Sequence, residues 1–276
     1  MWIDVLKAFF IGVIQGITEW LPISSTGHMI LFNEFFPMQV SDAFMEMFRV
    51  VIQFGSILAV LVLYFDRLNP WSKKKTAGQK KRTWRLWGKV ILATVPAGIV
   101  GVLFDNWMNA HFYTYTVVAI ALIVYGVAFI VIERLRGGKT AKAKKAEDIS
   151  VGQSAAVGCF QVLSLIPGTS RSGSTIMGAL IAGVSRTAAA EFSFFLAIPV
   201  MLGASLLKVA KYVLKTGIAF SGIEWMTLAV GIVTAFAVSL VVIRFLTDFV
   251  RRHSFAAFGW YRIILGAVVL LYGILR

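Results

Sequence analysis

The chain has 276 residues, of which 58% are hydrophobic, and its formal net charge is +14. Soluble domains contain about 45–50% apolar residues, so this composition excludes an ordinary soluble domain and indicates an integral membrane protein. The single cysteine, Cys159, excludes an internal disulfide and a cysteine-based metal cluster.

Six apolar segments are long enough to cross a bilayer, which takes about 20 residues of helix. Their apolar residues run continuously instead of alternating, which favours helices over membrane strands. In chain order, the expected spans are residues 48–65, 87–104, 115–133, 190–208, 225–246 and 257–275.

Two further stretches, residues 4–34 and 152–184, are only moderately apolar. Each is broken near its middle by a proline with glycine and hydroxyl residues after it, in LPISSTGH (21–28) and IPGTSRSGST (166–175). Such half-length runs are typical of re-entrant segments, which enter the membrane and return; two kinked ordinary spans are the alternative. The predicted fold is an all-α integral membrane protein with six transmembrane helices and two re-entrant helical pairs.

The two broken stretches resemble one another. Residues 12–25 align with residues 158–170 with one gap, which matches the prolines and places Ser25 opposite Ser170. The order of elements also agrees in the two halves, which favours an internal repeat over a chance similarity between apolar helices.

This repeat divides the chain into two units and a linker. Each unit holds one re-entrant pair and three spans, and because three is an odd number of crossings, the topology of the second repeat is inverted. The predicted units are residues 1–136 with the pair 4–34, a basic cytoplasmic linker at 137–149, and residues 150–276 with the pair 152–184.

Most basic residues lie in loops. With alternating crossings, loops 66–86, 134–150 and 247–256 fall on one side with 16 Lys and Arg residues, against 2 in loops 105–114 and 209–224. The positive-inside rule places the richer side in the cytoplasm, and no aromatic-basic motif for nucleic acid is present. Both termini then lie outside, and the two polar tips meet near the middle of the membrane. We expect other charged residues to pair or to lie at the interface: Glu133, Arg186, Glu191 and Arg244.

The first tip combines a carboxylate, an imidazole and hydroxyl groups. Gln15 and Glu19 are four residues apart and share a helical face. Ser24 or Ser25 can cap a second short helix, on which His28 lies on the same face as the capping serine. Capping and core hydrogen bonding explain each residue singly, but their convergence in one broken apolar segment favours a functional site.

The second tip has the features of an anion site. Gly168 lets the backbone approach a ligand closely, and the next residues supply N–H groups at a helix start. Arg171 adds donors suited to phosphate oxygens. The alternative is an Arg171–Glu19 pair that serves structure alone. It does not explain why an arginine is used, because burying one costs about 2.5–3.5 kcal/mol even on the lenient insertion scale.

Together the two tips suit phosphoryl transfer, in which catalysis is mostly positioning and charge neutralisation. One tip offers an anion cradle and the other a carboxylate with candidate nucleophiles. Glu19 and Gln15 also offer the oxygen ligands that a hard divalent cation such as Mg²⁺ or Ca²⁺ prefers.

These motifs resemble those of the bacterial undecaprenyl-diphosphate phosphatase family, also called bacitracin-resistance proteins. The resemblance is carried by QGITE (15–19), LPISSTGH (21–28) and PGTSRSGST (167–175), and it extends over the length and element order of the chain. It implies an enzyme that converts undecaprenyl diphosphate to undecaprenyl phosphate, the lipid carrier for peptidoglycan and related polymers. It also implies a divalent cation and an active site that opens to the outer side of the bacterial plasma membrane.

The resemblance assigns roles motif by motif. Glu19 takes the acidic role, Ser25 the nucleophile role, and His28 is a catalytic partner or a rival nucleophile. Many members carry a second glutamate where this chain has Gln15, which offers a carbonyl oxygen but no charge; its metal role is left open. The expected phosphate contacts come from both tips: Arg171, Ser170, Gly168, Ser172, Thr175, Ser24 and Thr26.

The expected reaction begins with attack on the outer phosphorus by Ser25, by preference with His28 as its base. Glu19 is the alternative base, and His28 or water is the alternative nucleophile. A transporter or flippase is the rival function, because inverted repeats with broken helices at the midplane are common in transporters. The expected partners are undecaprenyl diphosphate and membrane lipid but no nucleic acid, and a homodimer is one candidate assembly.

Overall fold

The computed structural model describes residues 2–112, 114–136, 139–217 and 220–275. Regular structure over these residues is helical, which confirms the all-α prediction. Six helical segments are long and apolar enough to cross a membrane, so this is a multi-pass membrane protein. In chain order they are α3 with α4 (Asp42–Val51 and Gln53–Leu63), α6 (Ala77–Phe112), α7 (Tyr115–Arg136), α10 (Arg186–Thr216), α11 (Gly222–Arg252) and α12 (Ala256–Leu275).

The first two spans differ from their expected limits. The segment predicted at 48–65 begins earlier, because Ser41 Oγ accepts a hydrogen bond from Phe44 N over 3.2 Å and caps α3. Helix α6 begins at Ala77, well before the predicted residue 87. Its early residues include Gln, Lys and Arg, which are strong helix formers and extend the helix beyond its apolar run.

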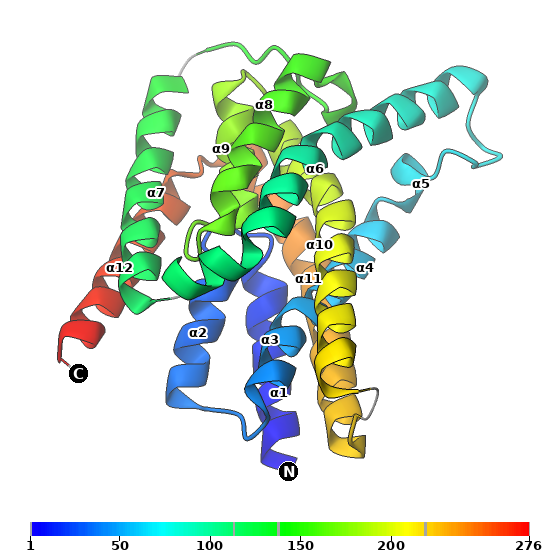
Figure 1. Ribbon diagram of the computed structural model, residues 1–276. Helices are drawn as coiled ribbons and strands as arrows, with labels where there is room; N and C mark the ends of the chain where they lie inside the picture. Colours follow the sequence, from blue (N-terminus) through cyan, green and yellow to red (C-terminus); the bar gives the residue numbers. More distant parts are fainter. Residues whose placement is uncertain (1, 113, 137–138, 218–219, 276) are drawn as a thin grey trace.

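Each broken stretch forms a helical hairpin (Figure 1). In both hairpins the turn between the helices lies in the interior of the molecule, as expected of a re-entrant pair. The depth of the hairpins in a membrane and the division into inverted repeats stay predictions. The first hairpin is α1 (Trp2–Thr18) with α2 (Ser25–Phe35); the second is α8 (Val151–Val162), the 3-10 turn η2 (Leu163–Leu165) and α9 (Arg171–Ile181).

Close helix contacts fix the surroundings of these hairpins. A Cβ atom on Gly12 of α1 would lie 2.8 Å from the carbonyl oxygen of Gly231 in α11, and one on Gly126 of α7 would lie 2.7 Å from that of Gly259 in α12. Only glycine permits such an approach, which is typical of helix packing in membranes. Helices α11 and α12 are thereby held beside the first hairpin and beside α7.

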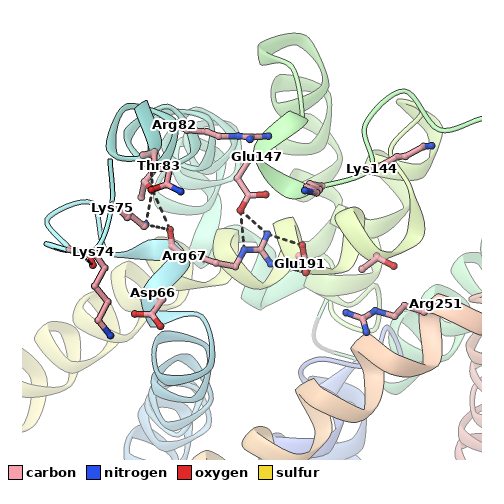
Figure 2. Close-up of a pocket in the computed structure, with 14 residues that line it drawn as sticks. Asp66, Arg67, Lys74, Lys75, Arg82, Thr83, Lys144, Glu147, Glu191 and Arg251 are labelled. Carbon is pink, nitrogen blue, oxygen red and sulfur yellow. Dashed lines mark hydrogen bonds and ion pairs between the residues drawn. The ribbon is translucent and has the colours of Figure 1, made fainter. Parts of the chain in front are cut away.

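A charged cluster holds the end of the molecule that carries the basic loops (Figure 2). Arg67, in the short helix α5 (Phe65–Leu68), donates to Glu147 over 2.8 and 3.0 Å and to Glu191 over 2.8 and 3.0 Å. Burial opposes the charge of Arg67, but the hydrogen bonds and charges of Glu191 and Glu147 outweigh it and raise its pKa above the ordinary value. The cluster ties α5 to the turn η1 (Ala146–Asp148) and to α10.

A cavity of about 720 Å³ adjoins this cluster, and residues of all three basic segments line it. These segments therefore lie at one end of the molecule, as expected, and both ends of the chain lie toward the opposite end (Figure 1). The expected pairing is confirmed for Glu191 and also for Glu133, which binds Arg186 over 2.6 Å. Arg244 is exposed and has no ion pair within the described part of the chain.

Candidate active site

The two hairpin turns meet in the interior, and an ion pair joins them. Arg171 Nη2, at the start of α9, donates to Glu19 Oε1, just after α1, over 2.9 Å. Ser172 Oγ donates to the carbonyl oxygen of Leu21 in the first turn over 3.3 Å. The side chains of Arg171 and Glu19 are only 10% and 4% exposed. The predicted meeting of the two tips is confirmed.

Both turns end in a serine with an unusual backbone conformation. Ser24 has φ 75° and Ser170 has φ 73°, in the left-handed region that residues other than glycine rarely adopt. Each serine caps the helix that follows: Ser24 Oγ accepts from Gly27 N over 3.3 Å, and Ser170 Oγ accepts from Gly173 N over 3.1 Å. The two caps stabilise the same strained turn in both hairpins.

The matched caps correct the alignment of the two tips. The counterpart of Ser170 is Ser24, so the pairing of Ser170 with Ser25 is wrong by one residue. Without a gap, Gln15 meets Gln161 and Ser24 meets Ser170; the gap arose because the prolines were matched. In this register Ser25 and Arg171 are each the first residue of a helix.

Glu19 is the centre of the polar cluster. Its Oε2 accepts hydrogen bonds from Ser25 Oγ and from Gln15 Nε2, each over 2.9 Å, and its Oε1 accepts from Arg171. A carboxylate accepts without donating, so it satisfies all three donors at once. One carboxylate thus contacts both a serine hydroxyl and a guanidinium group.

Arg171 is held from a second side by α10. Its Nη1 donates to Ser193 O over 2.8 Å and to Ser193 Oγ over 3.2 Å, and its guanidinium carbon lies 5.9 Å from the centroid of the Trp20 ring. Its Nε is buried and has no partner among the described residues. Ser193 was not predicted as a site residue, because its only signal in the sequence is a serine inside an apolar span.

His28 contacts groups other than Ser25. Its Nδ1 lies 2.7 Å from Ser24 O, and its Nε2 lies 2.7 Å from the hydroxyl oxygen of Tyr261 in α12. A carbonyl oxygen only accepts, so Nδ1 carries the proton and donates to Ser24. The geometry therefore pairs the Ser25 hydroxyl with Glu19, the alternative base, and not with the preferred His28. Tyr261 gave no signal in the sequence, because it lies far along the chain in an ordinary span.

Two of the expected phosphate contacts have different surroundings. Thr175 is fully buried, its hydroxyl lies 2.7 Å from Ser193 Oγ, and it donates to Arg171 O over 3.0 Å. Ser172 is 1% exposed and lies 3.1 Å from Ser170 Oγ. Both hydroxyls bind protein groups because the first turn of α9 packs against α10 and the first hairpin; their contact with a phosphate stays a prediction.

Gly168 also differs from its expected role. It has φ +92°, and a Cβ atom there would lie 2.6 Å from the carbonyl oxygen of Val118 in α7. The glycine is thus needed for the close approach to α7; its contact with a phosphate stays a prediction. The side chain of Thr26, another expected contact, lies outside the described part of the structure. Ser170 is partly exposed at the start of α9, next to the Arg171 side chain, which is 10% exposed.

A cation site is compatible with Gln15 and Glu19. Gln15 Oε1 is buried without a hydrogen-bond partner, next to the amide nitrogen that binds Glu19. The described residues contain no group of three or more His, Cys, Asp or Glu side chains that could hold a metal. A Mg²⁺-type ion is usually bound by one or two carboxylates, water and substrate phosphates, so the Glu19 carboxylate and the unpartnered Gln15 Oε1 are of the right chemical type.

Fold and site define a multi-pass membrane protein whose interior holds a carboxylate–arginine–serine cluster at the junction of two helical hairpins. The chain belongs to the bacitracin resistance protein BacA family, whose model matches residues 8–268. It is 52% identical over 269 residues to the undecaprenyl-diphosphatase of Enterococcus faecalis (strain ATCC 700802 / V583), covering 98% of this chain and 97% of the relative.

Other relatives are similar over the same length. The chain is 54% identical to undecaprenyl-diphosphatase 1 of Clostridioides difficile (strain 630), with 98% and 96% of the two chains covered. It is 50% identical to the undecaprenyl-diphosphatase of Streptococcus mutans serotype c (strain ATCC 700610 / UA159), with 100% and 98% covered. The similarity therefore extends over both hairpins and all six spans.

Proposed function

We propose that this protein hydrolyses undecaprenyl diphosphate to undecaprenyl phosphate and inorganic phosphate. The activity recycles the lipid carrier for cell-wall polymers and gives bacitracin resistance. The match to the BacA family and the shared name of relatives that are 50–54% identical support this function. The hydrophobic spans suit a polyprenyl substrate, whose tail lies in lipid while its diphosphate reaches the polar cluster.

The observation that carries the proposal is the position of Glu19 between Ser25 and Arg171. A serine hydroxyl is a weak nucleophile unless a base stands beside it, and Glu19 Oε2 lies 2.9 Å from Ser25 Oγ. A phosphoryl group needs positive charge beside it as it transfers, and Arg171 shares the other oxygen of Glu19. The proposed base Glu19, the nucleophile Ser25 and the positively charged Arg171 thus lie together at one point.

In the proposed reaction, the terminal phosphate lies against Arg171 and the first turn of α9. Ser25 Oγ attacks the terminal phosphorus while Glu19 takes the hydroxyl proton. The bond from that phosphorus to the bridging oxygen breaks, and undecaprenyl phosphate leaves. Water then attacks the phosphoserine: one of its protons restores the Ser25 hydroxyl, and inorganic phosphate departs with the proton held by Glu19.

We also propose that Glu19 and Gln15 hold a divalent cation, Mg²⁺ or Ca²⁺. When bound, such an ion neutralises phosphate charge. Gln15 contributes a neutral carbonyl oxygen, so the protein supplies one negative charge to the ion.

The proposed location is the bacterial plasma membrane, with the site facing outward. The positive-inside rule places the basic end of the molecule in the cytoplasm. The first hairpin is connected to the opposite end, where the chain begins (Figure 1), so its turn is reached from the outer side.

Phosphate release from undecaprenyl diphosphate by the purified full chain in detergent tests the function. A phosphatase releases phosphate in detergent, whereas a pure transporter catalyses no hydrolysis and has no gradient to use there. We expect Ser25→Ala to lower turnover by at least about 10³-fold, because the nucleophile is lost. Ser164→Ala is the matched control, because the one hydrogen bond of Ser164 Oγ among the described residues goes to the carbonyl oxygen of Gln161 near the second turn.

Each outcome separates one part of the proposal. A wild-type protein that releases no phosphate would end the assignment as a phosphatase. Near-normal turnover by Ser25→Ala would move the nucleophile to His28 or to water. A chelator should abolish release and added Mg²⁺ or Ca²⁺ should restore it; unchanged release in the chelator would remove the cation from the proposal.

A further inference from the structure

Arg262 is a buried arginine that the reaction described above does not use. It lies in α12 and is 0% exposed. Its Nη1 donates to Pro22 O over 3.0 Å, and its Nη2 donates to Gly168 O over 2.8 Å. One guanidinium group therefore binds the backbone of both hairpin turns.

Arg262 has no carboxylate partner among the residues that the structure describes. None of its described contacts is an ion pair: its two hydrogen bonds go to carbonyl oxygens, its guanidinium carbon lies 5.8 Å from the centroid of the Tyr125 ring, and its Nε has no partner. Buried arginines in membrane proteins generally pair or mark functional sites, because an isolated charge is unfavourable there. Two carbonyl oxygens would be satisfied by any neutral donor, so hydrogen bonding alone does not explain a charged residue.

The position of this charge relates it to the phosphate site. A Cβ atom added to Gly173 would lie 3.1 Å from Arg262 Nη1, so the guanidinium lies against the first turn of α9. Arg171 begins the same turn, and the N-terminus of a helix already attracts anions. Arg262 therefore adds positive charge next to the first turn of α9, against which the terminal phosphate lies in the proposed reaction.

We propose that Arg262 is a positioning residue with two effects: it sets the separation of the two turns, and its charge strengthens phosphate binding at α9. The inference rests on the proposed phosphatase function. The anion that compensates Arg262 is the substrate diphosphate, which acts on it through the α9 turn without touching it.

The test compares three substitutions in the full-length protein. Arg262→Lys keeps the charge and one donor group, Arg262→Gln keeps a donor amide without charge, and Arg262→Met keeps neither. We expect kcat/KM to fall about 100-fold in Arg262→Met, because the turns lose their common anchor. Arg262→Lys should recover most of the affinity for inorganic phosphate, measured as competitive inhibition, whereas Arg262→Gln should bind phosphate about tenfold more weakly, which is the size of a typical single electrostatic contact.

A merely structural role would give another pattern. In that case Arg262→Lys and Arg262→Gln would have equal inhibition constants for phosphate, and the charge effect would be refuted. Unchanged kcat/KM in Arg262→Met would refute the positioning effect. If wild type releases no phosphate, the proposed function fails; if wild type is active and all three variants match it, only the role of Arg262 fails.

A second variant keeps the test open if substitution of Arg262 prevents folding. Gly173→Ala keeps Arg262 but puts a methyl group 3.1 Å from its Nη1 and 3.2 Å from Ser170 Cβ, so these groups must shift by a few tenths of an ångström. Gly203→Ala in α10 is the control, because an added Cβ atom there meets nothing within 4 Å. We expect Gly173→Ala to weaken phosphate inhibition severalfold and Gly203→Ala to leave it unchanged; equal inhibition in both would contradict the proposal.

Discussion

Two arginines, Arg67 and Arg171, each join parts of the chain that are far apart in sequence, but they are satisfied to different degrees. Arg67 makes four hydrogen bonds to two carboxylates, Glu147 and Glu191 (Figure 2). Within the described part of the chain, Arg171 has one carboxylate partner, Glu19, and its buried Nε has no hydrogen-bond partner. The Arg67 network is satisfied by protein carboxylates, whereas Arg171 still has a donor, Nε, that can bind a further group.

This difference supports our proposal that the Arg67 ion pairs are structural and the Arg171–Glu19 pair is functional. A guanidinium with two carboxylates is over-neutralised and has little affinity for a further anion. A guanidinium that shares one carboxylate with a serine can exchange part of that contact for a phosphate. We therefore expect substitutions at Arg67 to change stability, and substitutions at Arg171 to change activity.

The carboxylates provide the largest contrast. Glu19→Gln removes the proposed base of Ser25 and the partner of Arg171, so we expect phosphate release to fall at least about 10³-fold. Glu191→Gln makes the same chemical change in the structural network and should leave activity within about threefold, while the melting temperature falls by about 2–4 °C per kcal/mol lost. Activity and thermal unfolding in detergent measure both. Equal loss of activity in the two variants would mean that the clusters do not differ in function.

The arginines themselves give the next contrast. Arg171→Met should lower kcat/KM about 10²–10³-fold, because a donor aimed at the transferring phosphate is lost. Arg67→Met should retain activity and unfold at a lower temperature, because Glu191 and Glu147 are left without their cation. An active Arg171→Met protein would place the phosphate elsewhere.

Much of the fold follows from the sequence, because the lipid phase requires long apolar helices whose backbone groups bind one another. The six spans were predicted in number and order, and their errors lie at polar ends such as Ala77, where hydropathy carries no signal. Ile52, where the first span breaks into two helices, is apolar like its neighbours, so composition alone does not predict the break.

The site was predictable where it depends on local chemistry. Glu19 and Arg171 stood out because charges in apolar segments are unfavourable, and the structure brings them into contact. Ser193 and Tyr261 were missed because their roles arise from α10 and α12 packing beside the hairpins, a relation between distant segments that no local pattern encodes. The assignment of His28 as the base of Ser25 relied on spacing, which gives the helix face but not the side-chain partner.

Tyr261 tests a residue at the edge of the site, where we expect a smaller effect than in the Glu19–Arg171 cluster. Its hydroxyl is the partner of His28 Nε2 and lies outside the Glu19 cluster. Loss of one hydrogen bond changes free energy by about 1 kcal/mol, so Tyr261→Phe should lower kcat/KM about fivefold if His28 must be held in place. Tyr272→Phe, in the same helix, is the control. A larger loss in Tyr261→Phe than in His28→Ala would be inconsistent with a role that acts only through His28.

The smallest expected effect concerns the paired caps Ser24 and Ser170. Alanine at Ser24 loses the bond to Gly27 N and keeps the unfavourable φ of 75°, so we expect a loss of about 1–2 kcal/mol in the free energy of unfolding. Glycine also loses the bond but adopts positive φ freely, so Ser24→Gly should differ from wild type by only a few tenths of a kcal/mol. If alanine and glycine have equal effects on thermal unfolding, backbone strain does not contribute. The same ranking at Ser170 would show that the two turns, one followed by Ser25 and the other by Arg171, are stabilised by the same cap and backbone conformation.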